Sequence, residues 1–256
     1  MRTSLLLLGA ALSVSPLCLR AQLVDLELSL LIDVSGSVSA TEFNLQRQGY
    51  VDAFNNAAVQ STILSTANGH QGRIAANVIY WSGAGQQSEV VGWSLLDSAA
   101  SIGAFASSIG STLRPYQGNT AVGDALAFAT PGFAANSFDA PRQVIDVSGD
   151  GATNSGGDTL TARNAALAAG VDTINGIIIL GQSGLSTFYS NNVVGGTGGF
   201  LLTATGFDTF GTAIADKLKF EIGGGPVPEP STYGAIGAAV LCGLVLWRRR
   251  STRNPA

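Results

Sequence analysis

Charged side chains are scarce in this sequence and make up only 12% of its 256 residues. Residues 22–226 contain 16 acidic and seven basic side chains, so this body is acidic. It has too few cations to neutralise a run of phosphates, which argues against nucleic acid as a partner. The two cysteines, Cys18 and Cys242, lie in hydrophobic segments near the ends. We therefore expect no disulfide within the folded body.

Recognisable catalytic motifs are lacking as well. The sequence has no Ser-His-Asp order, C-x-x-C pair, phosphate-binding glycine loop or paired glutamates. Its one histidine, His70, stands in the polar stretch 68–72, where we expect a solvated loop side chain. No lysine lies near the aspartates described below to hold a phosphate. We therefore expect that the protein is not an enzyme, with a hydrolase as the less favoured alternative.

Residues 1–21 have the layout of a secretory signal peptide. Arg2 supplies a positive charge, residues 5–14 are apolar, and Ala21 closes a possible cleavage site. The apolar core is too short to span a bilayer comfortably. The alternative is that these residues form the first strand or helix of the fold.

An apolar run, residues 28–32, ends abruptly in Asp33, and Ser35 and Ser37 follow. Such a run is typical of a strand buried on both faces of a parallel sheet, and open α/β sheets bind ligands at the carboxyl ends of their strands. One carboxylate and two hydroxyls suit Mg²⁺, Mn²⁺ or Ca²⁺. The alternative is a plain turn leading to a helix cap, because Asp and Ser dominate both.

A helix is expected to begin after Ser39, because Ser39 and Glu42 have the spacing of a capping box. The apolar residues behind it repeat at helical spacing: Phe43, Tyr50, Val51, Phe54 and Ala58.

Strand and helix patterns alternate along the rest of the body. Apolar runs typical of strands cover residues 73–81, 87–95, 142–147 and 173–180, with a weak one within 195–202. Helical patterns cover residues 96–109, a segment from 122, 160–169 and 207–220. The short link between 73–81 and 87–95 indicates an antiparallel hairpin at a sheet edge. The expected fold is therefore α/β and doubly wound, with a mostly parallel central sheet, one antiparallel edge strand and helices on both faces.

Two more polar residues stand at the ends of predicted elements. Thr120 lies in a polar loop that enters a helix, and Asp150 follows the strand 142–147. The alternatives are a helix cap for Thr120 and an ordinary turn for Asp150. Asp146 stands inside the apolar strand, roughly 13 Å from Asp150 along an extended chain. It cannot share a metal with Asp150 directly, and we expect it to be hydrogen-bonded in the interior, without an assigned role.

Together these motifs resemble those of a von Willebrand factor type A (vWA) domain, in order and spacing, across residues 25–220. The family's metal-ion-dependent adhesion site (MIDAS) has a D-x-S-x-S motif, a loop threonine and a later aspartate, which correspond here to Asp33, Ser35, Ser37, Thr120 and Asp150. The stretches IDVSGSVSATEFNLQRQGYVDAF and VIDVSGDG resemble an uncharacterised bacterial branch of that superfamily. One departure is that the strand RQVIDV is less apolar than is usual in the family.

The resemblance implies that Ser35, Ser37 and, in one state, Thr120 bind Mg²⁺ (or Mn²⁺ or Ca²⁺) directly. Asp33 and Asp150 then act partly through water. One coordination position stays open for an Asp or Glu of a protein or matrix partner.

The C-terminal part changes character after residue 222. Residues 223–230 form a Gly/Pro linker that ends in Val227-Pro228-Glu229-Pro230. Residues 231–247 are uncharged and mostly apolar, as in a transmembrane helix, and a basic tail, 248–256, follows. This arrangement resembles the PEP-CTERM sorting signal of Gram-negative bacteria, which an exosortase protease reads. The arginines at its end act as the membrane stop: Arg248, Arg249 and Arg250. The alternative is an ordinary anchor without processing.

The sequence therefore predicts an exported, surface-associated binding module, residues 22–222, that engages its partner through a divalent ion. Before processing it would be anchored in the inner membrane and face the periplasm. After processing it would reach the outer surface or the extracellular matrix. The main alternative is a structural component of the exopolysaccharide matrix, in which the metal only stabilises the fold.

Overall fold

The computed structural model describes residues 21–224. The predicted signal peptide up to Arg20, the sorting motif, the transmembrane segment and the basic tail lie outside the described residues. Within residues 21–224, no helix combines the length and the apolar character needed to cross a membrane.

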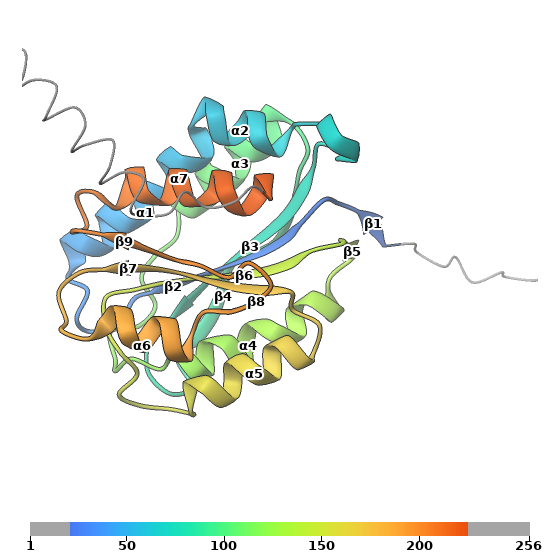
Figure 1. Ribbon diagram of the computed structural model, residues 1–256. Coiled ribbons are helices and arrows are strands. Elements are labelled where there is room, and N and C mark those ends of the chain that lie inside the picture. The colour runs from blue at the N-terminus through green and yellow to red at the C-terminus, as the bar shows by residue number, and fades with distance from the viewer. Residues whose placement is uncertain (1–20, 225–256) are drawn as a thin grey trace, which may run out of the picture.

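A mixed, mostly parallel sheet forms the centre of the molecule (Figure 1). Its parallel strands are β3 (Ile74–Trp81), β2 (Glu27–Asp33), β6 (Gln143–Gly149), β7 (Thr173–Ile179) and β9 (Leu201–Ala204), in that spatial order. β4 (Gln87–Leu96) pairs antiparallel with β3 at one edge, which confirms the predicted hairpin. Two short strands, β1 (Gln22–Leu23) and β5 (Phe138–Asp139), form a separate parallel pair.

The weak strand predicted within 195–202 is wrong in detail. The structure has two short strands there, β8 (Gly195–Gly196), antiparallel to the start of β7, and the parallel β9. Gly196 and Gly198 have positive φ angles of 82° and 73°, which turn the chain between them. Only glycine adopts this conformation readily, so one continuous strand cannot form here.

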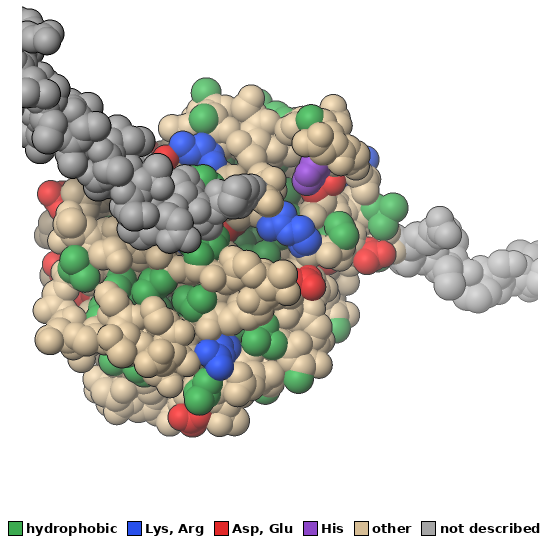
Figure 2. Space-filling view, viewed as in Figure 1, with side chains coloured by type: hydrophobic (Ala, Val, Ile, Leu, Met, Phe, Trp, Pro, Cys, Tyr) green, Lys and Arg blue, Asp and Glu red, His purple; other side chains and the backbone are tan. Residues whose placement is uncertain are grey.

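Helices cover both faces of the sheet (Figure 1). One face carries α1 (Ala40–Asn55), α2 (Ala57–Ile63), α3 (Ala99–Gly110) and α7 (Phe210–Gly223), and the other carries α4 (Val122–Ala135), α5 (Thr159–Ala168) and α6 (Leu185–Asn192). A short 3-10 turn, Ala67–Gly69, follows α2. The side chains under each set of helices form their own apolar cluster, so the sheet separates two cores. Figure 2, in the same view, shows a few charged side chains scattered over the surface among hydrophobic and other atoms.

β2 lies in the middle of this arrangement, and all seven of its residues are buried. Leu30 and Ile32 face the core under α1 and α7, whereas Leu31 faces the core under α4. Successive side chains in a strand point to opposite faces, so a central strand needs apolar residues at every position. This requirement explains the apolar residues at 28 and 30–32 before Asp33, although Glu27 and Ser29 of the same strand are buried polar residues.

The helix predicted after Ser39 ends earlier than the apolar spacing indicated. α1 ends at Asn55, and Asn56 begins α2 by accepting hydrogen bonds from the amides of Ala58 (2.9 Å) and Val59 (3.4 Å). Ala58 therefore belongs to α2. Asparagine is among the strongest N-caps, so a new helix begins there although the apolar pattern continues.

The capping box at the start of α1 is confirmed. Ser39 Oγ accepts a hydrogen bond from the Glu42 amide (3.2 Å), and the Ser39 amide donates to Glu42 Oε2 (2.7 Å). This cap fixes the point at which the chain leaves the D-x-S-x-S segment and enters the helix.

We expect Ser39→Ala to lower the free energy of unfolding by about 1 kcal/mol, because an amide at the helix start loses its acceptor. Urea denaturation followed by circular dichroism measures this change. Ser61→Ala, the same substitution on an exposed position of α2, is the matched control and should have little effect. Equal losses in the two variants would show that the cap contributes nothing specific.

Candidate metal centre

Asp33 and Asp150 lie side by side at the carboxyl edge of the sheet. β2 and β6 are neighbouring parallel strands in which Ile32 pairs with Ser148, so both strands end at the same level. Asp33 is the last residue of β2, and Asp150 follows the last residue of β6. The parallel pairing therefore brings together two carboxylates that are far apart in the sequence.

A chain of hydrogen bonds links four of the five predicted ligands. The Ser35 amide donates to Asp33 Oδ1 (2.7 Å), and the hydroxyls of Ser35 and Ser37 lie 3.0 Å apart. Ser37 Oγ donates to Asp150 Oδ1 (2.7 Å). The two carboxylates and two hydroxyls thus form one cluster, and Ser37 is its exposed end.

Thr120 is held beside this cluster by the loop that carries Asp150. Its amide donates to Asn154 Oδ1 (2.8 Å), and its carbonyl oxygen accepts from the Asn154 amide (2.9 Å). Its hydroxyl oxygen lies 3.5 Å from the position that a Cβ atom on Gly151 would occupy. The helix-cap alternative is wrong, because the N-cap of α4 is Ala121, which makes no side-chain cap.

One buried oxygen of the cluster has no hydrogen-bond partner in the described part of the chain. It is Oδ2 of Asp33, a side chain that is fully buried. Burial, together with the negative charge of Asp150, raises the pKa of Asp33 to about 7. Burial also raises the pKa of Asp150, and the hydrogen bond from Ser37 offsets part of this effect.

These residues fit a hard divalent cation. Two carboxylates that disfavour each other's ionisation are stabilised by a positive charge between them, and hydroxyl and carboxylate oxygens suit Mg²⁺, Mn²⁺ or Ca²⁺. Within residues 21–224, no three His, Cys, Asp or Glu side chains come together to hold a metal. A metal at this edge would therefore depend on the serine and threonine hydroxyls.

Arg114 supports the cluster by binding the backbone of residues 34 and 35, and the sequence patterns did not identify it. Its guanidinium donates to the carbonyl oxygens of Val34 (3.0 Å) and Ser35 (2.5 Å). The Gln46 side chain donates to the carbonyl oxygen of Asp33 (2.9 Å). These contacts fix the backbone of the D-x-S-x-S segment. A lone arginine in a loop carries no sequence signal that would reveal this role.

Gly149 is required for the close packing beneath Asp33. A Cβ atom at this position would lie 2.3 Å from the Tyr189 hydroxyl and 3.1 Å from Asp33 Oδ2. Both neighbouring side chains are fully buried, so neither can move aside freely. Gly149 and Tyr189 were not among the predicted site residues.

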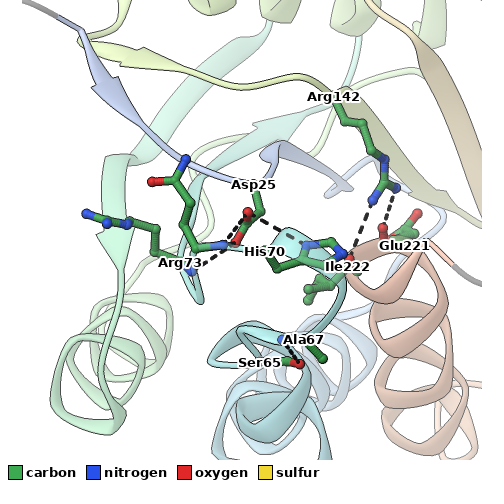
Figure 3. A network of polar contacts seen from close by, with 9 residues as sticks. Asp25, Ser65, Ala67, His70, Arg73, Arg142, Glu221 and Ile222 are labelled. Carbon is green, nitrogen blue, oxygen red and sulfur yellow. Dashed lines mark hydrogen bonds and ion pairs between the residues drawn. The ribbon is translucent and has the colours of Figure 1, made fainter.

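His70 lies near the amino ends of the parallel strands, opposite the end that carries Asp33. Its Nδ1 is 3.7 Å from Oδ1 of Asp25, which precedes β2, whereas Asp33 ends it (Figure 3). Asp25 also accepts hydrogen bonds from the amides of Gln71 and Arg73. The histidine therefore helps to hold a loop and is remote from the two carboxylates of the metal edge.

Several solved structures share this fold at low sequence identity. Proximal thread matrix protein 1 from the mussel byssus, with a zinc-occupied MIDAS motif, is 18% identical over 79% of this chain and 46% of its own, with a TM-score of 0.54. The pilus adhesin SpaC from Lactobacillus rhamnosus GG in its open conformation is 14% identical over 79% of this chain and 31% of its own (TM-score 0.56). The SpRpn10 VWA domain is 16% identical over 80% of this chain and 100% of its own (TM-score 0.54).

These likenesses show a vWA-like α/β fold. The chain spans less than half the length of the mussel protein that it matches. No curated protein is significantly similar to it in sequence.

Family models match nearly all of the sequence after the first 22 residues. Residues 226–250 match the PEP-CTERM protein-sorting motif, which indicates an exported protein that is sorted to the cell surface. Residues 23–226 match the family described as "Protein of unknown function (DUF1194)". The chain therefore belongs to the DUF1194 family, with a vWA-like fold and a C-terminal PEP-CTERM sorting motif.

Proposed function

We propose that this protein is a surface-associated binding module that engages its partner through a divalent ion. The ion would be held by Asp33, Ser35, Ser37, Thr120 and Asp150. The observation that carries the proposal is the hydrogen-bonded chain from Asp33 to Asp150, in which one buried carboxylate oxygen has no partner among residues 21–224.

By the vWA resemblance, the hydroxyls of Ser35, Ser37 and Thr120 would bind the ion directly. Asp33 and Asp150 would act through water and supply the compensating negative charge. A bound Mg²⁺, Mn²⁺ or Ca²⁺ supplies a positive charge that attracts an anionic oxygen. Arg114 and Gln46 position the segment by holding the carbonyl oxygens of residues 33–35.

An acidic side chain is the ligand that best suits such a centre. Without the ion, Asp33, Asp150 and the nearby Glu42 would repel a carboxylate. With the ion, the same carboxylate completes its coordination, so the ion controls binding. The structural likeness to a pilus adhesin supports a role in adhesion.

A structural role in the extracellular matrix is the second candidate, because a byssal thread matrix protein shares the fold. In that case the ion would stabilise the domain without contacting a partner. Enzymatic turnover is not part of either proposal. His70 pairs with Asp25 at the other edge of the sheet, away from the two carboxylates.

Export and sorting complete the proposal. The PEP-CTERM motif implies processing by an exosortase. The apolar segment 231–247 and the arginines after it would hold the chain in the inner membrane until then, because moving several arginines across is costly. Cleavage near Val227-Pro228-Glu229-Pro230 would release the body to the outer surface or matrix.

The proposed metal centre predicts that the effect of Asp33→Asn on stability changes sign with metal. The variant should be less stable than the wild type in Mg²⁺ and more stable in EDTA. In saturating Mg²⁺, at a hundred times its dissociation constant, the wild type should gain about 2.7 kcal/mol and the variant nothing. In EDTA the variant should be the more stable protein at pH 8, because an asparagine avoids burying a charge while it still accepts from the Ser35 amide.

The pH dependence in EDTA follows from the raised pKa of Asp33, about 7 when folded and about 3.9 when unfolded. The unfolded chain releases this proton first, so the wild type loses stability relative to Asp33→Asn as the pH rises from about 4 to 7. Asp158→Asn is the matched control, because it makes the same change in the loop after β6 and keeps the cap of α5. An undiminished Mg²⁺ effect in Asp33→Asn would place the ion elsewhere.

Metal-dependent recognition of carboxylates separates the two candidate functions. We expect the wild type to bind peptides that present Asp or Glu in Mg²⁺, and to release them in EDTA. Matched peptides with Asn or Gln should not bind, nor should Asp33→Asn bind either set. Surface plasmon resonance measures this directly. Metal stabilisation without any carboxylate binding would favour the structural role.

The sorting proposal predicts the mass of the exported protein in a host that has an exosortase. The mature chain should end near Val227-Pro228-Glu229-Pro230 and lack Trp247 and the arginine run. A Glu229→Ala variant should retain these residues, because the motif is no longer read. Intact-mass spectrometry distinguishes the two forms. A wild-type mass that still includes Trp247 would mean that the segment is only an anchor.

A further inference from the structure

A second group of ionisable side chains lies in the core between the sheet and α7, away from the metal edge. Asp146 projects from the middle of β6, and Lys217 and Glu221 project from α7. The side chains of all three are fully buried. On β6, Asp146 points to the opposite face from Ile145 and Val147, which explains an acid within an otherwise apolar strand.

The Lys217 ammonium lies between the two carboxylates. Its Nζ is 2.5 Å from Asp146 Oδ1 and also contacts Glu221 Oε1. Glu221 Oε1 accepts a second hydrogen bond from Asn175 Nδ2 (2.8 Å). The face of the Phe200 ring lies 5.4 Å from Nζ. Lys217 therefore contacts one carboxylate from its own helix and another from the central sheet.

Asp146 has an interior partner, as expected, in the short contact of its Oδ1 with Lys217 Nζ. Its other oxygen, Oδ2, has no hydrogen-bond partner within residues 21–224. One Glu221 oxygen is also without a partner there. A buried ion pair offsets its desolvation only when its remaining oxygens are satisfied, so this arrangement is costly as a set of charges.

The charges of the cluster do not balance either, since two acids face one base. Burial and the charge of Asp146 raise the pKa of Glu221 to about 7. Burial also raises the pKa of Asp146. The nearby Tyr50 is fully buried, and burial together with the charge of Asp146 raises the pKa of its hydroxyl, so it stays neutral beside the cluster. Near neutral pH the cluster can therefore hold a proton on Glu221.

We propose that Lys217 and Asp146 condense to form an intramolecular amide bond, with Glu221 carrying protons during the reaction. The product is an isopeptide cross-link between β6 and α7. This modification is independent of the metal centre.

The reaction balances without an oxidant or another reactant. Starting from the ionised form of Glu221, Lys217 passes one ammonium proton to Glu221, and the neutral Nζ attacks Cγ of Asp146. The new N–C bond forms as one C–O bond of the carboxyl group breaks. The proton from Glu221 and the second proton from Nζ both end on the departing oxygen, which leaves as water. One ammonium and one carboxylate are thereby replaced by a neutral amide.

Three features of the site favour this reaction. The reacting groups are held in contact by the packing of α7 on the sheet, which removes the entropic cost of bringing them together. The site is closed to solvent, which favours loss of water and neutral groups over charged ones. Glu221 is fixed by Asn175 beside the attacking nitrogen.

The position of the cross-link suggests a mechanical purpose. α7 ends at Gly223, directly before the PEP-CTERM segment that begins at residue 226. Arg142, just before β6, also ties this end of α7 to the sheet by donating to the carbonyl oxygens of Glu221 (2.5 Å) and Ile222 (3.4 Å) (Figure 3). Before processing, a pull on the segment after α7 would reach the central sheet through a covalent bond, and α7 would not detach from the sheet.

Mass spectrometry of the denatured full-length chain tests the proposal. The chain contains only two lysines, Lys217 and Lys219. We expect the protein to be lighter than its sequence by one water. Trypsin should leave the peptide 143–163 joined to the peptide that contains Lys217, uncleaved after that lysine. An amine reagent applied in denaturant should label Lys219 but not Lys217.

Lys219→Met is the matched control, because Lys219 pairs with Asp216 (2.7 Å) on the exposed side of the same helix. It should keep the loss of water, whereas Lys217→Met should have the full sequence mass. Glu221→Gln, which keeps the shape of the side chain, should slow the reaction or abolish it. The wild-type result does not depend on how the variants fold.

Two outcomes would overturn the proposal. One is a wild-type chain whose Lys217 is labelled in denaturant, even if its mass is lower by one water. A succinimide at Asp150-Gly151 would cause the same loss of mass and leave Lys217 free. The other is a link from Lys217 to Glu221, which would contradict the assignment of Asp146 as the partner.

Discussion

The parallel pairing of β2 with β6 is the constraint on which the candidate site depends. It sets Asp33 and Asp150 at one level of the sheet edge, where Ser35 and Ser37 bridge them. A buried carboxylate beside a second, partly buried one is unfavourable by itself. The surrounding structure holds them by fixing the backbone of the D-x-S-x-S segment from outside, chiefly through Arg114. The protein's own contacts therefore set the geometry of the site.

A site of this kind trades stability for function. The buried Asp33 oxygen gains nothing in the metal-free protein, and the closeness of Gly149 to Tyr189 leaves no room for another side chain there. A fully apolar sheet edge would fold more easily. The proposed cation would offset the charge that burial disfavours, and the domain would then gain stability on binding it.

Sequence patterns predicted the features of the fold that depend on residues close together in the chain. The apolar run before Asp33, the capping box at Ser39 and the hairpin of β3 and β4 each depend on neighbouring residues, and each was predicted. α6 was missed because its sequence, LSTFYSNN, is mostly polar and buries few side chains. Arg114, Tyr189 and Lys217 contribute through contacts between distant segments, which leave no pattern in a single sequence.

β6 connects the two chemical centres. Its carboxyl end leads to Asp150 of the proposed metal centre, and Asp146 in its middle meets Lys217 of α7, the helix before the PEP-CTERM motif. A bound partner and a pull on the C-terminal end of α7 would therefore both act on this strand. β6 pairs in parallel with β2 on one side and β7 on the other. Force along the strand must then shear both ladders together, which a strand in the middle of a sheet resists better than one at its edge.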